Sequence, residues 1–143
     1  MATMKNGALT LFTVGLMAVG GCVTTGGNLS SSATRLERSA YALQDEADED
    51  GARSGYKHDA RELAEEAREF RRTVEDRRAD EGDVSDAFGQ VSRRYHSMRD
   101  EVERTRSREA EAEFRPVTEA YLDVEREMRS RDGKRDRYVS EDN

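Results

Sequence analysis

The chain of 143 residues contains no tryptophan, one proline and one cysteine, and aromatic residues make up only 6% of it. A single cysteine excludes a disulfide framework and any cysteine-rich metal centre. With Pro116 as the only proline, little interrupts long helices. Because hydrophobic residues account for 34% of the chain, the sequence predicts one modest domain with a thin core.

Charge of one sign also prevails, with 31 acidic against 24 basic residues and a net charge of −7. An acidic chain lacks the basic patch that nucleic-acid binding requires, so nucleic acid is not expected as a partner. The same balance argues against an electrostatic hold on anionic lipid. Nearly all the positive charge is arginine, which compositional bias is sufficient to explain.

The first 21 residues are distinct from the rest of the chain, since Lys5 is their only charged residue. An uncharged, largely apolar run covers residues 8–19 and ends in the small residues Gly20 and Gly21, followed by Cys22. This run of about twelve residues is too short to span a bilayer, which takes about 20 in a helix. The layout is typical of a cleaved export signal.

The segment Val19-Gly20-Gly21-Cys22 resembles the lipobox of bacterial lipoproteins, in which an aliphatic and two small residues precede cysteine; glycine at the second place is a mild departure. The resemblance implies signal-peptidase-II cleavage between Gly21 and Cys22. It also implies a diacylglycerol on the Cys22 sulfur and a fatty acyl chain such as palmitate on its new amino group. Two or more such chains give stable membrane anchoring. The alternative is an ordinary secretory signal with Cys22 as an incidental thiol.

The residue after the cysteine is Val23 rather than aspartate. By resemblance to enterobacterial sorting, this implies an outer-membrane lipoprotein whose domain faces the periplasm. We therefore expect a lipoprotein signal peptide at 1–21 and a flexible Gly/Ser/Thr-rich tether at 22–33. A helical bundle is expected at 34–132, followed by a polar, disordered tail at 133–143.

Three apolar series with the alternating spacing of four and three residues predict amphipathic helices. The first follows a capping box formed by Thr34 and Glu37 and ends at Gly51. The others cover residues 56–74 and 84–102.

The boundary between the second and third helices is expected at Gly82, which would end one helix, and Asp83, which would cap the next. The resulting tight turn makes these two helices antiparallel neighbours.

A fourth apolar series, residues 114–128, does not continue the register of the third, and Pro116 lies where the register changes. One continuous helix over residues 84–128 would be about 68 Å long and would leave the last apolar stripe uncovered. A break near residues 111–115 lets the last helix fold back and bury that stripe. We favour the second arrangement, an all-α antiparallel bundle of four helices with coiled-coil-like packing; three helices with a long, proline-kinked last helix is the alternative.

Two histidines are each followed four residues later by a carboxylate: His58 by Glu62, and His96 by Asp100. Zinc normally takes three or four protein ligands, so neither pair is a complete site, and both histidines are interpreted as surface residues. No metal site, cofactor or nucleophile is expected, and the carboxylates lie on solvated helix faces. The remaining residues of possible chemical interest are interpreted as core: Tyr95, Met98, Tyr121 and Met128.

The sequence thus predicts a non-enzymatic protein held at a membrane by lipid on Cys22. It would act as an interaction or structural module of the cell envelope, binding envelope proteins or copies of itself. The alternative function is a metal- or small-ligand-binding bundle with a site near His58 or His96.

Overall fold

The computed structural model describes residues 29–49 and 52–139, with side chains through residue 131. This part of the chain forms four helices and no strand: α1 (Leu29–Glu49), α2 (Ser54–Glu75), α3 (Glu81–Thr105) and α4 (Arg108–Val139). The expected all-α, four-helix bundle is confirmed, and the three-helix alternative is wrong.

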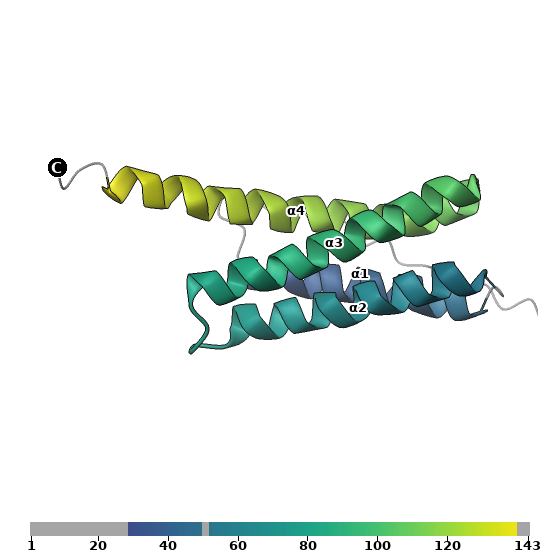
Figure 1. The fold of residues 1–143 in the computed structure, drawn as a ribbon, viewed down its shortest axis with the longest axis horizontal. Helices are drawn as coiled ribbons and strands as arrows, with labels where there is room; N and C mark the ends of the chain where they lie inside the picture. The colour runs from purple at the N-terminus through teal and green to yellow at the C-terminus, as the bar shows by residue number, and fades with distance from the viewer. Residues whose placement is uncertain (1–28, 50–51, 140–143) are drawn as a thin grey trace, which may run out of the picture.

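Consecutive helices run in opposite directions and lie side by side (Figure 1). Helix α1 packs against α2 and α4, and α3 packs against the same two helices, so the four form a closed ring without diagonal contacts. The two connections among described residues are short, 76–80 and 106–107, as expected between antiparallel neighbours.

The core contains only apolar side chains, and no polar or charged residue is buried in the described part of the chain. In α1 and α2 the buried residues are Leu29, Ala33, Leu36, Ala40, Leu43, Ala47, Tyr56, Ala60, Leu63, Ala64, Ala67 and Phe70. In α3 and α4 they are Val84, Val91, Tyr95, Met98, Val102, Ala110, Phe114, Val117, Ala120, Tyr121, Val124 and Met128. The stripes expected from the spacing of apolar residues are therefore confirmed, with Val74 and Phe88 only partly buried.

The first helix starts at Leu29, five residues before its expected start at Thr34. The Thr34 hydroxyl donates to the Ser30 carbonyl at 2.8 Å within the helix, so the proposed capping box is wrong. Leu29 and Ala33 extend the four-and-three series backward and are buried. Residues 29–33 consequently belong to the bundle and not to a tether.

The boundary between α2 and α3 also differs from the expectation. Helix α2 ends at Glu75, and α3 is capped by Asp80, whose side chain accepts a hydrogen bond from the Asp83 backbone N–H at 2.9 Å. The Asp83 carboxylate in turn accepts from the Asp80 N–H at 3.0 Å, which completes a capping box. Asp83 is therefore the partner of the cap, and Gly82 lies in the first turn of α3 rather than ending α2.

The chain folds back at residues 106–107, not near residues 111–115 as expected. Arg106 adopts the left-handed conformation with φ 51°, a role that glycine usually fills. The Ser107 hydroxyl accepts from the Ala110 N–H at 3.4 Å and thereby serves the start of α4. Pro116 lies inside α4, where both it and Ala112 are exposed, so the carbonyl that loses its partner lies on the solvent side.

Helix α4 continues through Gly133 to Val139, so the expectation of a disordered tail from residue 133 is wrong as far as residue 139. The predicted signal peptide, the cleavage site Gly21–Cys22 and tether residues 22–28 lie outside the described residues, as does Gly51. No helix in the described ranges is both long and apolar enough to cross a membrane.

Candidate functional site

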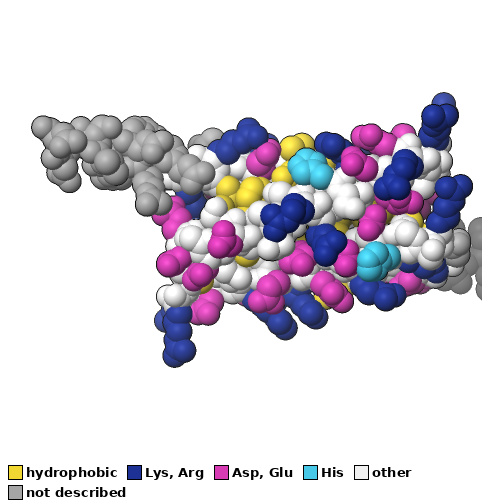
Figure 2. Space-filling model, viewed as in Figure 1, with side chains coloured by type: hydrophobic (Ala, Val, Ile, Leu, Met, Phe, Trp, Pro, Cys, Tyr) yellow, Lys and Arg dark blue, Asp and Glu magenta, His cyan; other side chains and the backbone are white. Residues whose placement is uncertain are grey.

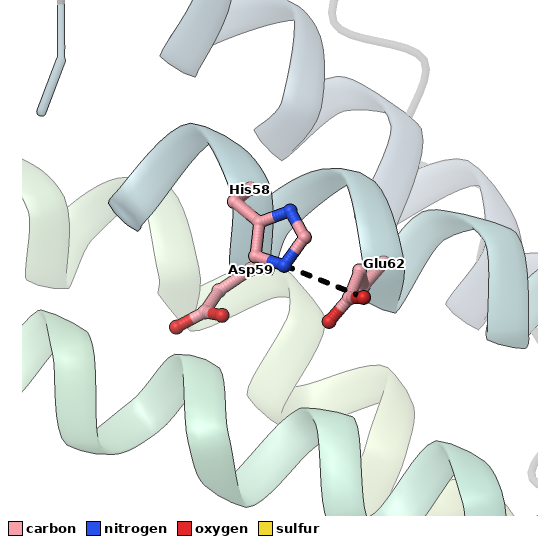
Figure 3. Close-up of side chains that lie close together, drawn as sticks. All are labelled: His58, Asp59 and Glu62. Carbon is pink, nitrogen blue, oxygen red and sulfur yellow. Dashed lines mark ion pairs between the residues drawn. The ribbon is translucent and has the colours of Figure 1, made fainter. Parts of the chain in front are cut away.

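Three side chains of metal-ligand type gather on the first two turns of α2 (Figure 3). His58, Asp59 and Glu62 occupy positions i, i+1 and i+4, which a helix places on one side of its surface. Their ligand atoms all lie within 4.8 Å of one another, and His58 Nε2 is 3.4 Å from Glu62 Oε1. This is the only such cluster in the part of the chain that the structure describes.

The His58–Glu62 separation suits a shared cation. Zinc binds nitrogen and carboxylate oxygen at about 2.0–2.2 Å, so two adjacent ligands of a tetrahedral site lie about 3.4 Å apart. The carboxylate of Asp59 could provide a third ligand after a side-chain rotation. Three protein ligands would leave the fourth position to water or to a ligand from a partner.

Glu62 is held from a second helix. Its other carboxylate oxygen, Oε2, forms an ion pair with Arg94 of α3. The first oxygen, Oε1, remains directed at His58. Arg94 therefore orients a candidate ligand, although its positive charge also opposes a bound cation. The His58 side chain is 65% exposed and that of Glu62 is 25% exposed, so the cluster is accessible from solvent.

The second histidine pair is not assembled. His96 places its ring edge-on to Tyr95 and Tyr121, with ring centroids 5.3 Å and 6.1 Å away. Asp100 instead makes an ion pair with Arg99 at 3.6 Å. The sequence spacing found both histidine pairs, but it missed Asp59 and Arg94, which join the cluster only through side-chain direction and the α2–α3 packing.

A pocket of about 230 Å³ lies at the end of the bundle where α1 and α3 end and α2 and α4 begin. Tyr56 lines it and its hydroxyl donates to Glu113 Oε2 at 3.5 Å. Burial raises the pKa of Tyr56, and the neighbouring carboxylate of Glu113 raises it further. Drug-sized ligands usually occupy about 300–1,000 Å³, so this shallow pocket is small for a ligand site.

The expected core tyrosines find the partners that buried hydroxyls need. Tyr95 donates to the Thr118 hydroxyl at 3.4 Å, and Tyr121 donates to the Ser92 hydroxyl at 3.0 Å. These hydroxyls are engaged within the bundle between α3 and α4. They therefore serve packing and not a binding site.

The fold defines the molecule as an all-α, four-helix bundle with one accessible His/Asp/Glu cluster. Comparison with family models, with curated proteins and with solved structures finds no match for the chain. The function is accordingly argued from the chain's own residues.

Proposed function

We propose that the protein is a lipid-anchored, periplasm-facing lipoprotein of the cell envelope that acts through non-catalytic binding. The observation that carries the proposal is the segment from Val19 to Cys22, which resembles a lipobox. The bundle begins at Leu29, only seven residues after Cys22. Seven residues reach at most about 25 Å, so lipid on Cys22 would hold the bundle close to the membrane, most simply the outer membrane.

The outer surface supports binding through charge more than through apolar contact. Acidic and basic side chains are interspersed over the face drawn in Figure 2, with small apolar areas between them. Leu122, at 46% exposure, is the one large hydrophobic residue that is exposed in the described part of the chain. The partner, an envelope protein or a second copy, would be recognised by complementary charge, and such binding weakens as salt rises.

Photo-crosslinking in the native host tests the proposal. A photoreactive residue at Arg72 of α2 or Leu122 of α4 would report on two exposed positions on different helices. We expect crosslinks to a defined envelope protein or to another copy, identified by mass spectrometry. The matched control carries Cys22→Ser, which would remove the anchor and with it the crosslink. Absence of any crosslink from either position at native expression would contradict the proposal.

A second function, divalent-cation binding, is favoured by the cluster of His58, Asp59 and Glu62. Calorimetric titration of the protein with zinc should give saturable binding that His58→Ala abolishes. The matched control is His96→Ala, which changes a histidine outside the cluster and should leave the zinc titration unchanged. No heat with the unaltered protein, or equal loss in both variants, would rule out this site.

A further inference from the structure

Helix α4 is the longest of the four, with 32 residues, and it runs past the other helices at one end of the bundle (Figure 1). An ion pair between Arg35 and Asp123 shows which levels of α1 and α4 lie side by side. Leu29 lies six residues before Arg35, and Arg129 lies six after Asp123, so antiparallel packing brings these two to the same level. The ten residues from 130 to 139 therefore project about 15 Å beyond the start of α1.

This projecting end differs in charge from the rest of the molecule. We name residues 129–139 the basic extension, because they include two acidic and five basic residues, a net charge of +3 in a chain of net charge −7. The basic residues are Arg129, Arg131, Lys134, Arg135 and Arg137. At the opposite end of the bundle, residues 45–49 include four acidic residues and no basic one. The turn where α2 ends and α3 begins lies at the same end as the basic extension, and residues 75–86 include six acidic and two basic residues. Because α4 runs past this turn (Figure 1), the basic extension carries the outermost charge at this end.

The helix dipole explains part of this pattern. Basic residues stabilise the last turn of a helix, and that effect is confined to about one turn. The basic extension covers about three turns, so the dipole accounts for its final residues and not for those before them. Of these earlier residues, Arg129 forms an ion pair with Glu125 at 2.9 Å. The dipole alone therefore does not account for the net positive charge of the basic extension.

The topology places the basic extension at the end of the bundle that a lipid on Cys22 would hold near the membrane. Helix α1 starts at the same end of the bundle, so the chain from Cys22 enters the bundle there. Seven residues separate Leu29 from Cys22, so lipid on Cys22 would lie within about 25 Å of Leu29. A projection of about 15 Å from that level covers more than half of the distance.

We propose that the basic extension rests on the anionic phospholipid surface into which the Cys22 lipid is inserted. This inference depends on the proposed lipid anchor. Exposed charges are screened beyond about 8 Å at physiological salt, so the outermost charge at the anchored end, that of the basic extension, acts most strongly on the membrane. The anchor keeps the basic extension at high local concentration, and a modest attraction then suffices. The acidic far end is directed away from the surface, and the bundle stands off the membrane in one orientation.

The test uses the lipidated full protein inserted into phosphatidylcholine vesicles with or without phosphatidylglycerol. The sulfur of Cys22 would be blocked by lipid, so Val139→Cys introduces the only reactive thiol. A fluorophore on that thiol transfers energy to an acceptor on lipid headgroups when the two are close. Arg108→Cys, at the opposite end of the same helix, is the control position.

We expect strong energy transfer from position 139 on phosphatidylglycerol vesicles and weak transfer on neutral vesicles or at high salt. Loss of one lysine or arginine charge near an anionic surface lowers binding about fivefold. The variant Lys134→Glu/Arg135→Glu/Arg137→Glu should therefore abolish the difference between vesicles. A variant with the same change in net charge, Arg61→Glu/Arg93→Glu/Arg115→Glu, should keep it.

In protein that carries lipid, energy transfer from position 139 that depends on neither phosphatidylglycerol nor salt concentration would overturn the inference. That result would leave the proposed anchor intact. The intact mass of the same preparation separates the two proposals. A mass without lipid would contradict the proposed function and remove the basis of the inference. Circular dichroism verifies that the charge variants remain helical; if the triple variant unfolds, the salt titration of the unaltered sequence decides.

Discussion

The two halves of the bundle, α1 with α2 and α3 with α4, pack through different kinds of side chain. Helices α1 and α2 present mainly leucine and alanine to the core, and small alanine side chains allow their backbones to approach closely along their length. Helices α3 and α4 meet at the turn formed by Arg106 and Ser107 and then diverge (Figure 1). Similar apolar spacing therefore yields close packing where residues are small and a wider interface where they are aromatic.

Aromatic rings fill the wider interface as one continuous row. Phe88 lies 5.8 Å from Phe70 and 5.8 Å from Tyr121, measured between ring centroids. Tyr121 stacks on Tyr95 at 3.9 Å, and Tyr95 lies 5.5 Å from Phe114. Phe70 belongs to α2, so this aromatic row connects the closely packed half to the wider one.

The largest effect is expected from Phe70→Asp, because Phe70 is fully buried where the two halves join. An unpaired carboxylate there would cost several kcal/mol, comparable with the whole stability of a small domain. We expect loss of the far-ultraviolet circular dichroism of helix. Arg72→Asp, at an exposed position on the same helix, is the control and should keep helicity. Full helicity in Phe70→Asp would show that the halves are not joined at this residue.

Enlarging an alanine should affect the closely packed half next most strongly. Ala40 is fully buried on α1, and Ala40→Leu should lower the free energy of unfolding by about 1–3 kcal/mol through overpacking. Ala42→Leu adds the same atoms on the exposed side of α1 and should change little. Urea unfolding measures both variants. Equal stability of the two would contradict close approach of α1 and α2.

The two halves should also differ in their response to alkaline pH. Burial raises the pKa of both Tyr56 and Tyr121 in the folded protein. Because the unfolded chain releases these protons near its ordinary pKa of about 10, their stabilising contribution is complete below pH 10 and is lost as pH rises above it. Above pH 10 the free energy of unfolding should fall less steeply in Tyr56→Phe than in Tyr121→Phe, because Glu113 adds to the rise in the pKa of Tyr56. Unfolding free energies measured across this pH range would refute the ranking if Tyr121→Phe had the larger effect.

The smallest effect concerns the turn that closes the wider half. Arg106 holds a left-handed conformation that costs an L-residue about 1–2 kcal/mol, and glycine adopts it readily at some cost in chain entropy. Arg106→Gly should therefore raise the free energy of unfolding by about 0.5–1 kcal/mol. Arg93→Gly, at an exposed position in the middle of α3, should lower it by about 1 kcal/mol. Destabilisation by Arg106→Gly in thermal unfolding would contradict the assigned turn.

Apolar spacing predicted the helix faces well, because burial selects those residues directly. It predicted the helix ends poorly, because competing local signals look alike in a sequence. Asp80 and Asp83 are both good caps, and only the folded turn shows which one caps α3. Arg106 gives no sequence signal for a left-handed turn. The start of α1 at Leu29 was missed because the serines that follow it are typical of a flexible linker.

Only part of the candidate site could be predicted from the sequence. The i,i+4 spacing of His58 and Glu62 identified the pair, because helix geometry alone brings such residues together. Asp59 joins them through its side-chain direction, and Arg94 through the packing of α3 on α2. Neither of these follows from spacing along one helix.

The proposed function and orientation both depend on lipid at Cys22, so the intact mass of the protein purified from native membranes is the most direct test. We predict a chain that begins at Cys22 and carries a diacylglycerol and at least one further acyl group. Fragmentation should place all of this added mass on the first residue. A chain that begins elsewhere, or one in which Cys22 is a free thiol, would contradict the account.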